Sequence, residues 1–347
     1  LLQREAGAAS SALWTPPDGR PHFTPKAKNV IWLFMNGGVS HMESFDPKPM
    51  LTKYAGKTIA ETPFASVQDP KKLALERLVV PDANGNQRNT LFPLQVGFRK
   101  HGQSGMEISD WFPHIAAHAD RLALVRSLWT TDSNHGAQTQ FHSGRHQNDG
   151  DFPNLGAWVH YGLGSLNENL PTFVVLVATP TNQEQNQAIA ARLWSSGYLP
   201  GEHAGVSFRS KGDPILFINN PAGVPSEIRQ QTIQNINALN ELNYKAVGDP
   251  EIHTRIKQYE MAFRMQSSVP ELTDLGNEPE STFALYGEEA RKRGSFANSV
   301  LMARRLAERG VRFTQIYLNN WDHHANVGTR MPSQCKDVDQ ACHALIQ

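Results

Sequence analysis

The fold is decided by the stretch Asn29-Val30-Ile31-Trp32-Leu33-Phe34-Met35-Asn36-Gly37-Gly38, a continuous apolar run that ends in a turn signal. Such runs are typical of strands buried on both faces, as in parallel sheets. Three further runs of the same kind follow, at 122–128, 172–177 and 311–318. We therefore expect a mostly parallel β-sheet that contains these four strands.

Amphipathic helical patterns separate the later runs. Apolar residues recur at helical spacing over 225–242, 250–267 and 296–309, and again from Val338 to Ile346. Buried strands that alternate with helices predict an α/β fold with helices on both faces of the sheet.

The expected domain organisation is one large domain. Residues 1–27 are rich in Ala, Pro and Gly and are expected to form an N-terminal tether before a domain spanning 28–347. Two stretches punctuated by Pro and Gly, about 61–105 and 179–221, are expected to be surface insertions. The last helical pattern runs to Gln347 without a stop signal, so we expect a domain that is incomplete at its C-terminus.

Composition excludes several classes of function. The 347 residues include 33 Lys plus Arg and 33 Asp plus Glu, so the formal net charge is zero. This balance argues against a nucleic-acid-binding or polybasic membrane protein. No apolar run approaches the ~18 residues of a membrane span. The only cysteines, Cys335 and Cys342, would lie about two turns apart on a helix, which is too far for an easy disulfide.

Candidate chemistry follows three of the four expected strands. Ser40-His41 and Asp46 come after the first, Asp132-Ser133-Asn134-His135 after the second, and Asp322-His323-His324 after the last. Residues just past the carboxyl ends of parallel strands share one edge of the sheet. We therefore expect these side chains to converge, although they are far apart in sequence.

Imidazole and carboxylate groups together suit Zn, Mn or Fe, and a bound metal lowers the pKa of water to about 7. Asp132-Ser133-Asn134 is also suited to cap a helix from about Gly136, whose free N–H groups would face an ester oxyanion. Each feature has a simpler alternative. Asp132 or Ser133 alone is more often a cap, Asp46 before Pro47 shapes a turn, and Arg126 would by default form ion pairs.

At these loops the chain resembles the bacterial family of domain of unknown function 1501. The matching stretches occur in order from about residue 28 to the end: Phe34–Pro49, Asn134-His135, Gly156–Gly164, Gly197–Pro200, Gly212–Leu216, Gly248–Glu251, Ser295–Asn298 and Trp321–His324. The resemblance implies an alkaline phosphatase-like, three-layer α/β/α sandwich with a mostly parallel central sheet. It also implies export to the periplasm or beyond.

The resemblance further implies a divalent metal (Zn, Mn, Ca or Fe) at the strand ends. Carried over by position, the metal ligands would be His41, Asp46 and Asp322 with His323 or His324. The catalytic region would be Ser133, Asn134 and His135. The family does not reliably place a Ser at position 133, and it commonly has an Asp where this chain has Glu43. Its further Glu-Phe-Gly-Arg and Asp-His motifs would lie beyond Gln347.

The function expected from these features is an exported, metal-dependent hydrolase of sulfate or phosphate esters, with a small-molecule or polysaccharide substrate and no nucleic-acid partner. The alternative is a non-catalytic exported binding or scaffold protein that retains the sulfatase-like fold. A third, weaker hypothesis is a phosphate-transfer enzyme such as a mutase. The sequence does not predict the oligomeric state.

Overall fold

The fold centres on a four-stranded sheet in the order β1-β6-β4-β5. The computed structural model describes residues 26–68, 90–131, 135–182, 189–210, 212–215 and 219–347. All three strand pairings in the sheet are parallel, between β1 (Val30–Met35), β6 (Phe313–Leu318), β4 (Phe173–Ala178) and β5 (Val206–Phe208). Leu318, the last residue of β6, aligns with both Met35 and Ala178, so the three longer strands end at the same level.

Strand β6 is buried along its whole length because it has a neighbour on each edge and packing on each face. Ile316 and Leu318 belong to the larger apolar cluster on one face. Phe313 and Tyr317 belong to a smaller cluster on the other face. This alternation is the two-residue period of a strand that is covered on both sides.

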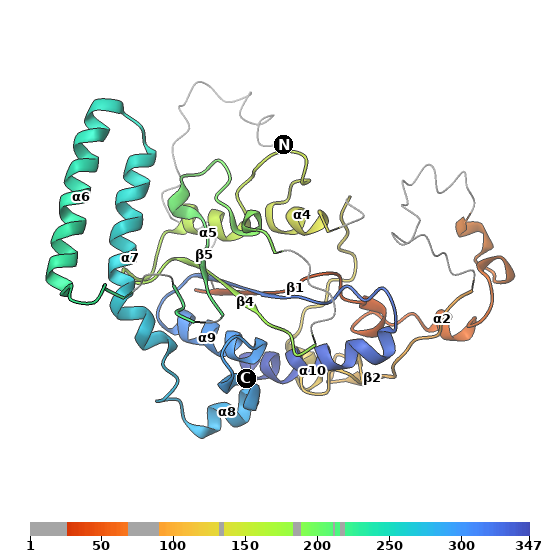
Figure 1. Ribbon diagram of the computed structural model, residues 1–347. Helices are drawn as coiled ribbons and strands as arrows, with labels where there is room; N and C mark the ends of the chain where they lie inside the picture. The colour runs from red at the N-terminus through yellow and green to blue at the C-terminus, as the bar shows by residue number, and fades with distance from the viewer. Residues whose placement is uncertain (1–25, 69–89, 132–134, 183–188, 211, 216–218) are drawn as a thin grey trace.

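Helices cover both faces of the sheet (Figure 1). On one side lie α4 (Ala137–Ser143) and α5 (Leu155–Leu163), and on the other lie α9 (Phe296–Glu308) and α10 (Val327–Ile346). Helix α9 is capped at its N-terminus by Ser295, whose side chain accepts a hydrogen bond from the Asn298 N–H. The protein is therefore a mixed α/β protein with a parallel sheet, as the sequence predicts.

The remaining elements extend from this body. Helices α6 (Ser226–Val247) and α7 (Glu251–Thr273) form a long hairpin that projects to one side (Figure 1). The other elements are α2 (Pro49–Lys53), α8 (Glu280–Tyr286), the antiparallel hairpin of β2 (Phe98–His101) and β3 (Met106–Ser109), and the 3-10 turns η1 (His41–Glu43), η2 (Ile59–Glu61), η3 (Ala65–Gln68), η4 (Ile115–Arg121), η5 (Ala191–Trp194), η6 (Gly201–His203) and η7 (Glu288–Arg291). None of the helices in the described ranges has both the length and the apolarity that a bilayer crossing requires.

The prediction of a strand at 122–128 is wrong. Leu124, Val125 and Leu128 are 39%, 58% and 68% exposed, and the segment takes no place in the sheet. Arg126 Nε donates instead to Phe45 O (3.0 Å), which ties the segment to the loop after β1. Its apolar side chains line a cleft rather than the sheet.

The fourth strand of the sheet is the three-residue β5, within the stretch 179–221.

The prediction that the two cysteines form no disulfide is confirmed. Cys335 and Cys342 are free, buried thiols on α10, and burial raises the pKa of both.

Candidate functional site

The loops after β1 and β6 are joined through Asn36. Its N–H donates to Leu318 O (2.8 Å), and its carbonyl accepts from the Trp321 N–H (3.1 Å). Its side-chain amide, completely buried, donates to Asn319 Oδ1 (2.7 Å). These three bonds hold the two strand ends together, so residues that follow either strand enter the same region.

Gly37 allows the closest approach between these loops. It has φ +127°, and a Cβ at this position would lie 2.6 Å from the Asp322 backbone nitrogen. Only glycine combines this backbone conformation with the missing side chain. The Asn36-Gly37 pair therefore sets the position of Asp322.

The loop that carries Asp322 is also fixed from α10. Gln334, fully buried on α10, donates its side-chain amide to Asn320 O. Asn320 has φ +78° and donates its own side-chain amide to Asn182 O (2.5 Å). Asparagine is one of the few residues that tolerates this backbone conformation.

Helix α4 brings a third segment to the ends of β1 and β6. His142, near its end, packs its ring 4.6 Å from Phe34 and 5.5 Å from Tyr317, measured between centroids. Its Nδ1 lies 2.6 Å from Gln138 O, and burial lowers the pKa of His142. The imidazole is therefore neutral near pH 7 and acts as an aromatic anchor. His135, two residues before α4, is thereby held near the ends of β1 and β6.

The centre of the site is the Asp322 carboxylate. Its Oδ2 lies 2.7 Å from His324 Nε2 and 3.3 Å from His135 Nε2. Two imidazoles from segments far apart in the sequence thus meet one carboxylate oxygen. The side chains are 22%, 33% and 45% exposed for Asp322, His324 and His135, so a ligand can reach them from solvent.

These groups line a cleft of about 950 Å³. Five of the eight residues predicted for the site are among its walls: His41, Asp46, His135, Asp322 and His324. The cleft is also lined by Arg126 and by the apolar residues Leu124, Val125, Leu128 and Phe141. Ser133 and Asn134 lie outside the described residues.

Asp46 is already engaged by cations. Its carboxylate accepts a hydrogen bond from Lys48 Nζ (2.7 Å) and lies 3.6 Å from Arg126 Nε. The Lys48 hydrogen bond, more than the charge of Arg126, holds the pKa of Asp46 below its usual range. The structure thus places Asp46 in the cleft as one member of a charged group with Lys48 and Arg126.

His323 does not join its neighbours in the cleft. Its ring lies 6.5 Å from that of Trp321, burial lowers its pKa, and its buried Nδ1 has no hydrogen-bond partner among the described residues. Asp322 and His324 line the cleft, whereas His323 is not among its walls.

The donor set at Asp322 fits a divalent metal in its chemistry, because one carboxylate and two imidazoles are ligands that Zn, Mn and Fe share. Within the ranges that the structure describes, no three His, Cys, Asp or Glu side chains stand in a ready metal-binding arrangement. Sequence reasoning missed the roles of Asn36 and Gln334. The Asn-Gly-Gly turn after β1 was the available signal for the first, and nothing in the local pattern indicates the second.

The fold and site define a class: α/β proteins with a cleft of imidazoles and carboxylates at the carboxyl edge of a parallel sheet. The family model of the protein of unknown function DUF1501 matches residues 27–347, and the chain belongs to this family. Comparison with curated proteins and with solved structures finds no match.

Proposed function

We propose that the protein is an exported, metal-dependent hydrolase of sulfate or phosphate esters with an alkaline phosphatase-like, three-layer arrangement. The observation that carries the proposal is the meeting of His135 and His324 on the Asp322 carboxylate inside a large cleft. Such convergence at strand ends is typical of sites that bind ligands in parallel α/β folds.

Asp322, His135 and His324 would hold the metal. A bound divalent metal would polarise an ester oxygen and make a water molecule more acidic. Asp46 is the weaker candidate ligand, because metal binding there would compete with Lys48 and Arg126. Ser133 and Asn134 keep their predicted roles as nucleophile candidate and anion-positioning residue.

The other residues that line the cleft would have separate roles. Arg126 adds a positive charge near the cluster, which complements a sulfate or phosphate group. His41 lines the same cleft, and its imidazole could donate a proton to, or accept one from, a bound ligand. Leu124, Val125 and Leu128 would contact the apolar face of the substrate, such as a sugar ring in a polysaccharide.

The test measures metal binding and ester hydrolysis on the same preparations. We expect the wild-type chain to bind Zn or Mn by calorimetry and to hydrolyse 4-nitrophenyl sulfate or phosphate. Asp322→Asn and His135→Ala should each lower both metal affinity and kcat/KM by about 100-fold, because the first removes the negative charge of a ligand and the second removes an imidazole ligand. His323→Gln, in the same loop but outside the cleft, should retain both.

A wild-type chain that binds no metal and turns over neither ester would refute this proposal. Specific binding on a glycan array without hydrolysis would then support the alternative, a non-catalytic binding or scaffold protein. Equal losses in His323→Gln and Asp322→Asn would show that the loop matters only for folding.

A further inference from the structure

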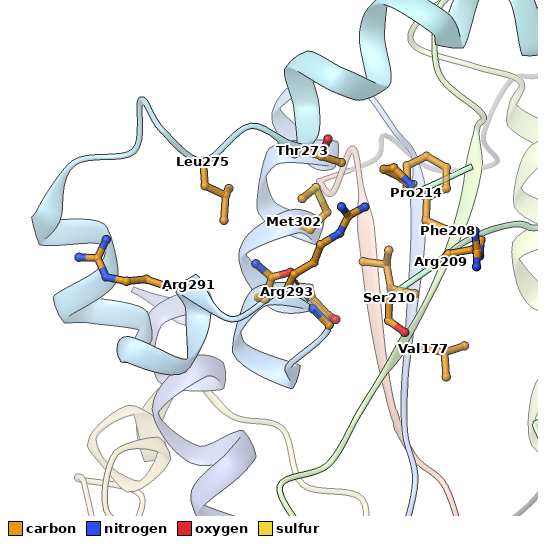
Figure 2. A pocket seen from close by; sticks show the side chains of 14 residues that line it. Val177, Phe208, Arg209, Ser210, Pro214, Thr273, Leu275, Arg291, Arg293 and Met302 are labelled. Atoms are coloured by element: carbon orange, nitrogen blue, oxygen red, sulfur yellow. Dashed lines mark hydrogen bonds between the residues drawn. The ribbon is translucent and has the colours of Figure 1, made fainter. Parts of the chain in front are cut away.

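A second cavity lies where β4 and β5 end beside the first turn of α9 (Figure 2). Its volume is about 220 Å³. Sites for drug-sized ligands occupy roughly 300–1,000 Å³, so this cavity suits a smaller molecule. The described residues that line it include none of those that line the cleft around Asp322.

The cavity is a built feature, because Gly294 fixes its two sides together. Gly294 has φ +82°, and a Cβ there would lie 2.8 Å from Ser210 O. Its carbonyl accepts a hydrogen bond from the Thr179 N–H (2.8 Å), just past β4. The segment with Arg293 is thereby held next to the segment with Arg209 and Ser210.

The charges that line the cavity are all positive. Arg209, Arg291 and Arg293 are among its walls, and none of the described residues that line it is an Asp or a Glu. Arg291 is neutralised by Glu288 (2.9 Å) and by Glu280. Figure 2 shows its side chain pointing away from the other labelled residues.

Arg209 and Arg293 form no ion pair with any carboxylate in the described ranges, in contrast to Arg291. Figure 2 shows Arg293 extending between α9 and the segment with Phe208 and Pro214. The cavity is therefore bordered by two exposed arginines whose charge is not compensated by any described residue of its walls.

Two other polar side chains of the cavity, those of Asn298 and Ser299, are satisfied internally. Asn298 Nδ2 donates to Ala290 O (2.8 Å), and Ser299 Oγ donates to Ser295 O (2.9 Å). Most of the remaining wall is apolar: Leu176, Val177, Phe208, Leu275 and Met302. A ligand would meet an apolar surface beside two guanidinium groups.

We propose that this cavity binds a small organic anion, with its carboxylate, sulfate or phosphate group on Arg209 and Arg293 and a short apolar body against Phe208 and Met302. Guanidinium groups bind such planar or tetrahedral anions through paired, charge-assisted hydrogen bonds. The inference does not depend on the proposed hydrolase activity, since the two cavities have separate walls.

The test uses phenylphosphonate, which has no ester bond to hydrolyse, in calorimetric titration of the full chain. Phenylphosphonate should bind more tightly than methylphosphonate or benzyl alcohol, because each of these supplies only one half of the recognition. Benzoate and benzenesulfonate, titrated in parallel, identify which anionic group the arginines prefer.

The variant R209A/R293A should bind phenylphosphonate at least about tenfold more weakly, because hydrogen bonds to charged groups are the stronger kind. R209K/R293K, which keeps both charges, should recover part of the affinity. R291A is the matched control, and its affinity should change less than about threefold because its charge is already paired.

The Asp322→Asn variant separates this site from the cleft and should bind phenylphosphonate as the wild type does. Two results would overturn the proposal. One is a wild-type chain that shows no saturable binding. The other is binding that R209A/R293A and R209K/R293K retain in full while Asp322→Asn loses it.

Discussion

At the scale of single residues, Gly37 and Gly38 make a matched pair. Both have strongly positive φ, +127° and +129°, but only Gly37 faces another backbone. We predict that Gly37→Ala lowers the free energy of unfolding by about 1–3 kcal/mol more than Gly38→Ala, because the clash with Asp322 adds to a strain that both share. Urea unfolding of the two variants measures this difference.

The same pair tests whether Gly37 sets the position of Asp322. Gly37→Ala should also weaken metal binding, since its Cβ would displace the Asp322 backbone, whereas Gly38→Ala has nothing within 4 Å to displace. Equal stability and equal metal affinity in both variants would contradict the role assigned to the close approach.

The sequence predicted which loops meet but not how their side chains point. His135 and Asp322 were expected to converge, and they lie 3.3 Å apart. The engagement of Asp46 by Lys48 and Arg126 depends on the conformation of the loop after β1. The separation of His323 from His324 depends on the local backbone direction. Neither is encoded in residue type or spacing.

At the scale of elements, three of the four strands follow from continuous apolar runs, and the fourth run shows the limit of that signal. Residues 122–128 are apolar apart from Arg126 and Ser127, but Leu124, Val125 and Leu128 line a cleft. An apolar run indicates contact with other apolar groups, and it does not distinguish a sheet from a cleft wall. Strand β5 has only three residues, which is too short for its apolar residues to form a recognisable strand pattern.

In the α6–α7 hairpin, the two helices differ in how deeply their leucine side chains are buried. Leu272, near the end of α7, is completely buried in the main core, whereas Leu239 on α6 is 66% exposed. We predict that Leu272→Ala lowers the free energy of unfolding by about 2–5 kcal/mol, because it removes buried methyl groups and leaves a cavity. Leu239→Ala, the same chemical change, should stay within about 0.5 kcal/mol.

Chemical denaturation of the two variants, followed by circular dichroism, measures both changes. The comparison determines whether the end of α7 belongs to the core while α6 is an appendage. A large loss in Leu239→Ala would show instead that the exposed face of α6 is covered in solution.

At the scale of the whole molecule, buried and half-buried neutral histidines make stability depend on pH. Burial lowers the pKa of His118, His142 and His203, and lowers that of His160 to about 4. In the unfolded chain a histidine titrates near 6.5, so between pH 6.5 and about 4 the unfolded state binds a proton at His160 that the folded state does not. This contribution to stability is complete above about pH 7 and is lost as the pH falls through that window.

His160 allows this contribution to be isolated. Its ring lies 4.6 Å from that of His203, where α5 meets η6. We predict that the stability difference between wild type and His160→Phe changes by up to about 1.4 kcal/mol per pH unit between pH 6.5 and 4, with the wild type losing more on acidification. Half-buried Asp337 and buried Asp339, whose raised pKa values act in the opposite direction, are common to both proteins and cancel in the difference. His160→Asn packs differently but also lacks the titrating group, so it should lose the same pH dependence. If the free energy of unfolding depended on pH in both variants as it does in the wild type, the prediction would be contradicted.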